Sequence, residues 1–202
     1  TWNKGWADAG YFEAACISLA EARYEDALDE VERSLISNSH NHKARALKAI
    51  VLRKLCKGDE ALEWIKESYK IDPFNYGCMF EEYLLTEDKE PLNRLMELMH
   101  GNVYNYHELA LDYAQAHQWM EAEQVLSISG IAEELKKNSP LTSYYIGYFK
   151  FGQGLMNEAI AFFQQAEMMD SSYCFPNRLE DVLVLNLAKS LNPTGARASY
   201  YL

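Results

Sequence analysis

Two stretches of this chain, ARYEDALDEVERSLISNS (residues 22–39) and CKGDEALEWIKESYKIDP (residues 56–73), align with each other without a gap. Ala27 falls on Ala61, so the two copies are offset by 34 residues (61 − 27 = 34). Residues upstream of each stretch also favour helix formation. Each repeat is therefore predicted to be two helices joined by a short turn.

The same pattern returns in residues 108–127 and again in residues 143–170. Each copy has one small residue in its first helix and one in its second, and small residues let packed helices approach closely. In the last copy, we expect Asn157 to cap the second helix. The predicted structural repeat positions are Ala15, Ala27, Ala49, Ala61, Ala110, Ala122, Gly147 and Ala159.

This arrangement resembles the tetratricopeptide repeat (TPR), in which a bulky residue follows the Ala of the second helix and Pro marks the exit. The resemblance implies an all-α fold, a right-handed α-α superhelix of about six antiparallel helix pairs. Residues 76–102 depart from the pattern, because Tyr83 stands where a small residue is expected. Pro91 is expected in the first turn of a shortened second helix, so the third pair should be irregular.

Part of the chain also resembles the TPR region of large bacterial proteins that carry an uncharacterised β-rich domain of carbohydrate-associated appearance. The resemblance extends from about residue 10 to the end, and it carries no active site onto this chain. Residues 199–202 (SYYL) echo residues 143–146 (SYYI), where a first helix begins. We therefore expect residues 1–202 to be a single TPR-like array, a fragment of a longer chain cut at both ends. The similar stretches are DPFNYGCMFEEYLL, YHELALDYAQAHQWMEAEQVL, SYCFPNRLEDVLVL and NPTGARASYYL.

The charge balance disfavours polyanionic partners. The chain has 19 Lys and Arg against 30 Asp and Glu, a formal net charge of −11, which repels nucleic acid and anionic membrane surfaces. No apolar run approaches the ~18 residues of a membrane span, and the N-terminal residues do not form a signal peptide. We expect no nucleic-acid partner, no membrane contact and a cytoplasmic location.

The sequence has no pattern typical of catalysis or metal binding. The four Cys residues lack C-x-x-C spacing and are expected to be buried free thiols. His107 and His117 are not four apart, as a helical metal site requires. FGQG (residues 151–154) lies between two helices without a preceding strand, so it is interpreted as a turn. We therefore predict no enzyme activity, no cofactor and no metal.

The concave side of a TPR array is lined by the first helices, and two zones of candidate ligand contacts fall there. The carboxylate clamp of chaperone-binding TPR proteins is not expected, because Phe12 and Cys16 occupy its Lys and Asn positions. The basic zone is Lys43, Arg53 and Lys54, and ordinary solvated charge is the preferred alternative for it. The aromatic zone is Tyr104, His107, Tyr144 and Tyr148, for which repeat packing has equal weight with ligand contact.

These features favour a non-catalytic scaffold that binds a protein or peptide segment through its concave face. One alternative is intramolecular docking or dimerisation of an adjacent domain of a larger protein. That role should leave a contiguous apolar patch on the surface. A second alternative, which rests only on the resemblance, is a carbohydrate-associated accessory region.

Overall fold

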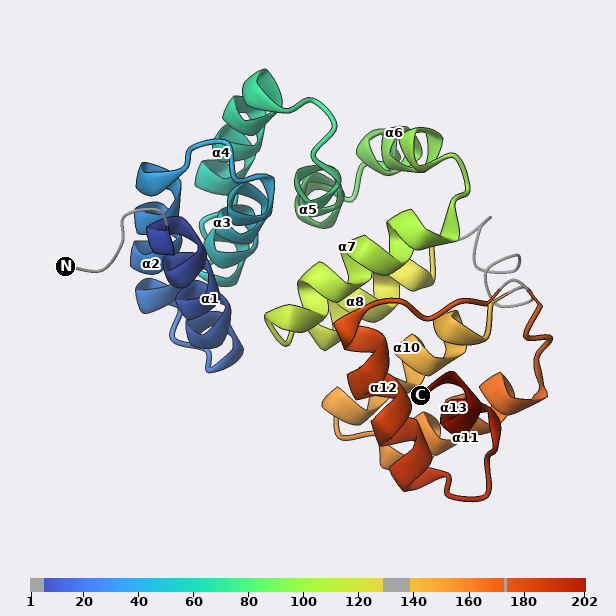
Figure 1. The fold of residues 1–202 in the computed structure, drawn as a ribbon. Helices are drawn as coiled ribbons and strands as arrows, with labels where there is room; N and C mark the ends of the chain where they lie inside the picture. The colour runs from blue at the N-terminus through green and yellow to red at the C-terminus, as the bar shows by residue number, and fades with distance from the viewer. Residues whose placement is uncertain (1–5, 129–138, 173) are drawn as a thin grey trace. The chain divides into compact units, whose positions relative to one another are not determined.

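The structure is a computed structural model that describes residues 6–128, 139–172 and 174–202. These residues form twelve α-helices and no strand, which confirms the all-α fold class (Figure 1). The chain divides into two compact units, Thr1–Gly101 and Asn102–Leu202. The single array and the handedness of its superhelix stay predictions, because each unit is described by itself.

The first unit consists of three consecutive helix pairs. In each pair the two helices pack against each other, as the repeat predicts. The third pair has 11 residues in each helix, and Pro91 lies in the first turn of its second helix. The six helices are α1 (Ala7–Ala20), α2 (Tyr24–Ser37), α3 (His42–Lys54), α4 (Gly58–Ile71), α5 (Tyr76–Thr86) and α6 (Lys89–Met99).

The second unit contains two further pairs, α7/α8 and α10/α11, followed by α12 and α13. Helix α12 packs on α10 and α13. Asn157 was expected to cap α11, but that helix begins at Met156 after Leu155, so Asn157 lies in its first turn. The helices are α7 (Val103–Gln115), α8 (Trp119–Leu126), α10 (Pro140–Gly152), α11 (Met156–Met168), α12 (Leu179–Leu191) and α13 (Arg197–Tyr201).

The turn between the two helices of a pair has the same backbone geometry in all four clear repeats. One residue takes a positive φ, and the next N–H donates to a carbonyl five residues earlier; Lys57 N–H to Leu52 O is 2.9 Å. This is the pattern of a Schellman motif, which satisfies carbonyls at a helix end. The positive-φ residues are Ala22 (58°), Cys56 (58°), His117 (53°) and Gly154 (80°).

Small residues lie where helices approach most closely. All eight predicted repeat positions are buried. A Cβ added to Gly147 of α10 would stand 2.5 Å from Cε1 of Phe163 in α11. At Gly77 of α5 it would stand 2.5 Å from Cβ of Ala46 in α3. The small size of Gly147, at a repeat position, and of Gly77, outside the repeat positions, therefore sets the distance between neighbouring helices.

Candidate functional site

The candidate site is the side of α7 and α10 that faces away from their second helices, here called the first-helix face of the second unit. Gly147 marks the side of α10 that packs on α11. Tyr145, two positions earlier, lies about 200° around the helix and therefore on the opposite side. Glu108 stands two positions before Ala110, so it has the same place on α7. The repeat thus puts these two side chains on one face.

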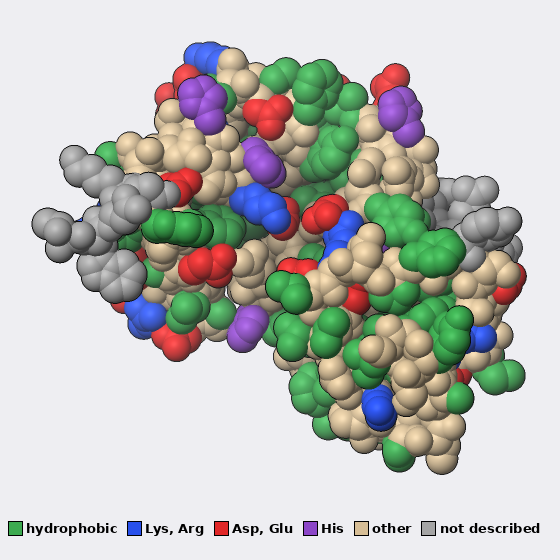
Figure 2. Space-filling model, in the orientation of Figure 1, with side chains coloured by type: hydrophobic (Ala, Val, Ile, Leu, Met, Phe, Trp, Pro, Cys, Tyr) green, Lys and Arg blue, Asp and Glu red, His purple; other side chains and the backbone are tan. Residues whose placement is uncertain are grey.

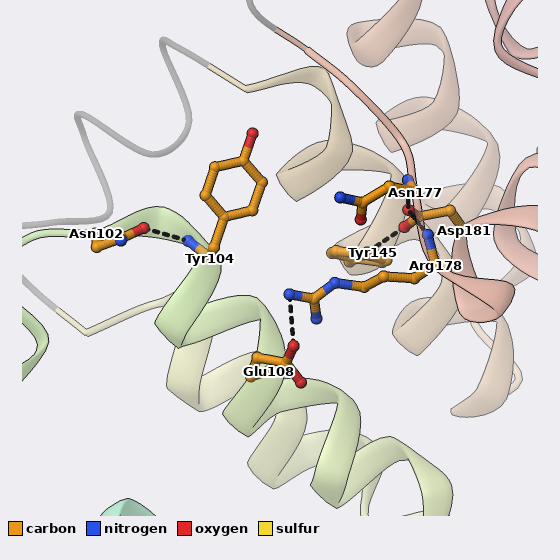
Figure 3. Close-up of polar contacts among 7 residues, drawn as sticks. All are labelled: Asn102, Tyr104, Glu108, Tyr145, Asn177, Arg178 and Asp181. Carbon is orange, nitrogen blue, oxygen red and sulfur yellow. Dashed lines mark hydrogen bonds and ion pairs between the residues drawn. The ribbon is translucent and has the colours of Figure 1, made fainter.

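Helix α12 packs on α10 at this face, and four polar side chains, here called the clasp, hold its N-terminal end (Figure 3). The clasp consists of Glu108, Tyr145, Arg178 and Asp181. Arg178, at the N-cap of α12, forms an ion pair of 2.6 Å with Glu108 of α7. The Tyr145 hydroxyl donates a hydrogen bond to Asp181 in the first turn of α12. One helix end therefore contacts two successive first helices.

Asp181 connects the N-terminus of α12 to Tyr145 of α10. Its Oδ2 accepts the backbone N–H groups of Asn177 (2.8 Å) and Arg178 (3.0 Å), while Oδ1 accepts the Tyr145 hydroxyl. A carboxylate at this position satisfies donors that a helix start leaves without partners, and it also complements the helix dipole. Burial, reinforced by the hydrogen bond to Asp181, raises the pKa of Tyr145, which therefore stays a hydrogen-bond donor.

Helix α12 carries apolar side chains on two sides. Val184, Leu185 and Ala188 are buried, at the spacing of one helical stripe. On the outward side, Leu179 is 82% exposed and Leu183 is 65% exposed, and hydrophobic side chains gather over α12 in Figure 2. The inward stripe and the clasp fix α12 to the first-helix face, and the outward side remains open to solvent.

The structure places the four residues of the aromatic zone in different surroundings. Tyr104, on the first turn of α7, is 39% exposed. His107 and Tyr144 are fully buried. Tyr148 is half-buried, and its ring meets the edge of Trp119 with a centroid distance of 5.3 Å. Tyr104 is therefore the most exposed member of the zone.

Both buried members have polar partners inside the unit. His107 Nε2 lies 2.8 Å from Thr142 Oγ1, and burial lowers its pKa to about 3, so the ring is neutral. The Tyr144 hydroxyl donates to Glu167 of α11 at 2.8 Å. Glu167 also accepts the backbone N–H of Arg197, at the start of α13, at 2.9 Å. These contacts stabilise the packing of first helices on their neighbours.

The basic zone belongs to the first unit. Lys43 and Lys54 are half-buried on α3. Arg53 forms a bidentate ion pair with the carboxylate of Glu81 from α5. The Nε–Oε2 distance is 2.6 Å and the Nη2–Oε1 distance is 3.1 Å. This pairing compensates the Arg53 charge within the protein. The two zones lie in separate units.

Sequence reasoning missed Glu81, Glu108, Arg178 and Asp181. A signal for two of them was present, since Glu108 stands two positions before Ala110 and Glu81 two positions before Tyr83, which occupies the same repeat position. Asp181 stands three positions after Arg178 at the start of a predicted helix, as a capping residue would. Tyr145 was missed as well, although it stands two positions before Gly147, and Arg178 carries no such signal.

The described residues show no site for a metal. No group of three His, Cys, Asp or Glu side chains in residues 6–128, 139–172 and 174–202 could hold an ion. Cys16, Cys78 and Cys174 are buried free thiols as expected, but Cys56 is exposed because it occupies the turn between α3 and α4. Within the same described ranges, no helix has both the length and the apolar character needed to cross a membrane.

Thirteen chains of solved structures match this chain, and two of them are the following. The crystal structure of the MamA protein is 18% identical, with 80% of this chain and 91% of that chain covered and a TM-score of 0.42. A thermophilic TPR protein of Thermus thermophilus is 21% identical, with 92% and 98% covered and a TM-score of 0.45. No family profile and no curated protein sequence matches the chain. At these identities and scores, neither structure assigns a role to a residue here.

Proposed function

We propose that this chain is a non-catalytic, TPR-like scaffold that binds a protein or peptide segment through its first helices. The observation that carries the proposal is the packing of α12. Glu108 and Tyr145, at one repeat position of successive first helices, both bind the N-terminal end of this helix. A face that holds one helical segment through repeated positions is suited to recognising a segment of a partner.

A library of displayed peptides, selected against the whole chain, tests this function. Hydrogen exchange of the complex should show protection on first helices. Tyr104→Ala should weaken binding by about 1 kcal/mol or more, since exposed aromatics are frequent binding hot spots. Tyr144 is unsuitable as a test residue, because it is buried and its truncation would destabilise the unit.

The matched control is Met120→Ala, on the second helix α8, where Met120 is 65% exposed. It should leave peptide affinity unchanged. Protection confined to second helices, or equal losses from Tyr104→Ala and Met120→Ala, would contradict binding through the first helices. Selection of no peptide at all would also count against the function.

The outward side of α12 favours self-association as a second candidate function. Leu179, Val182 and Leu183 form an exposed apolar stripe, as expected of a docking or dimerisation face. Sedimentation equilibrium of the whole chain should then show dimers that Leu183→Glu converts to monomers. Ile36→Glu, at an 85% exposed position of α2, is the control and should have no effect. A wild-type chain that stays monomeric at high concentration eliminates this candidate.

A further inference from the structure

We propose that α12 is a built-in occupant of the first-helix face of the second unit, and that the partner of this face is an amphipathic helix with the pattern of α12. The inference rests on the function proposed above and narrows it from any peptide segment to a helix. The observation that supports it is that α12 binds Glu108 of α7 and Tyr145 of α10, which hold one repeat position, although α12 is not part of the regular succession of helix pairs.

The position of α13 shows that α12 interrupts the repeat. Glu167, near the end of α11, accepts the backbone N–H groups of Arg197 (2.9 Å) and Ala198 (3.2 Å) at the start of α13. Arg197 also donates to the carbonyl of Ala166 at 2.9 Å. Helix α13 therefore begins beside the end of α11, where a next first helix is expected. Helix α12 is an insertion between them, laid over the face of α10.

The sequence of α12 defines the chemistry of the partner. Arg178 binds the carboxylate of Glu108, and Asp181, three residues later, accepts the Tyr145 hydroxyl. Val184, Leu185 and Ala188 then supply the buried stripe. A competing helix should have a basic residue at its N-terminal end, an Asp one turn later and apolar residues over the next two turns. Its opposite side should be polar, unlike that of α12.

The contacts that bind α12 to the first-helix face are weak enough for another helix to displace it. The Glu108 side chain is 57% exposed, so its ion pair with Arg178 is screened by salt and contributes little to stability. The outward side of α12, which includes Leu179 and Leu183, is exposed to solvent, so α12 is covered on one side only. In competition for this face, α12 is favoured over a free helix because it is attached to the chain. The attachment gives α12 an effective concentration on the order of millimolar.

A fluorescent peptide of residues 174–192 is the probe, titrated into the whole chain and followed by anisotropy. The resident α12 should make binding to the wild type weak. Leu185→Ala in the chain removes a buried side chain from the inward stripe of the resident helix but leaves α7 and α10 intact. The peptide should then bind at least about 10-fold more tightly than to the wild type.

Leu183→Ala is the matched control, because Leu183 lies on the outward side of the same helix. It should leave the peptide affinity at the wild-type value. A peptide with Asp181→Asn should bind the Leu185→Ala chain at least about 10-fold more weakly, since it loses the charged acceptor for Tyr145. If Leu185→Ala fails to fold by circular dichroism, the smaller truncation Val184→Ala in the same inward stripe takes its place.

Two results would overturn the inference. In the first, the peptide binds none of the chains, and α12 amides exchange only together with those of α10, which makes α12 an integral part of the unit. In the second, Leu185→Ala and Leu183→Ala bind the peptide equally well. Neither result refutes the proposed scaffold function, which fails only if library-selected segments do not bind first helices.

Discussion

Arg53 of α3 and Glu81 of α5 form a two-point ion pair, in which the Glu81 side chain is fully buried. The pair joins the first helices of neighbouring repeats, 28 positions apart. Both charges are held by short, parallel hydrogen bonds, a geometry that the planar guanidinium favours. Stability then depends on Arg53 being present, because the fully buried Glu81 carboxylate would otherwise lose this ion pair.

Replacing Arg53 by Met should therefore lower the free energy of unfolding by about 3–5 kcal/mol, since Glu81 would stay buried without its main counter-charge. Denaturant unfolding measures the loss. The double variant Arg53→Met/Glu81→Met should recover much of it. Arg33→Met, which breaks an exposed ion pair with Asp29 (2.8 Å), is the control and should cost less than about 1 kcal/mol. If Arg53→Met and Arg33→Met lower the free energy of unfolding equally, burial does not determine the contribution of the Arg53–Glu81 pair.

Buried His107 should make the protein sensitive to acid. Its pKa is about 3 in the folded state, because of burial and then the nearby Arg178 charge, against an ordinary 6.5. Between these values the unfolded chain binds the proton and the folded chain does not. Stability is thus complete above pH 6.5 and falls towards pH 3, by up to about 1.4 kcal/mol per pH unit.

The contribution of His107 is measured by following the free energy of unfolding against pH for the wild type and for His107→Gln. The variant should show a smaller slope, because it lacks the proton uptake of His107. His42→Gln, at an exposed position of α3, should keep the wild-type slope. Identical slopes for the wild type and His107→Gln would show that His107 takes up its proton in the folded state.

The helix–helix turns should respond to glycine according to their φ angles. Gly154 has φ of 80°, so Gly154→Ala should cost about 1–2 kcal/mol. Ala22 occupies the same turn position at φ of 58°, so Ala22→Gly should stabilise by up to about 1 kcal/mol. Gly10→Ala is the control, because Gly10 lies within α1 with open space around it, and it should stabilise by up to about 1 kcal/mol. Thermal unfolding measures these changes in stability. If Gly154→Ala and Gly10→Ala change the stability in the same direction, the argument from the φ angle of the turn is wrong.

The repeat register makes a prediction about overpacking. Ala61 and Ala122 are fully buried between helices, so Ala→Leu at either should cost about 1–3 kcal/mol. Ala161→Leu, on the exposed side of α11, should stay within about 0.5 kcal/mol of the parent. If the variants at Ala61 and Ala122 both melt within about one degree of the parent, the register is wrong.

The sequence alone predicted the local architecture because its cause is local. The recurrence of Ala15 at Ala49 and of Ala27 at Ala61 placed each pair of helices, and the structure buries all four residues. Helix periodicity and turn signals act over a few residues, so one chain is enough to read them. The cap assigned to Asn157 was wrong, as α11 begins one residue before it. A helix end depends on single hydrogen bonds, which periodicity does not specify.

What only the tertiary structure decided is which side chains meet across repeats. Tyr144 and Tyr104 both fit the sequence pattern of ligand-facing residues. In the structure, Tyr144 is buried against Glu167, whereas Tyr104 is partly exposed. Tyr145 and Asp181 meet across 36 positions of sequence because α12 crosses α10. The repeat determines which face of its own helix a residue occupies, whereas burial of that face depends on a distant helix, here an insertion that follows no period.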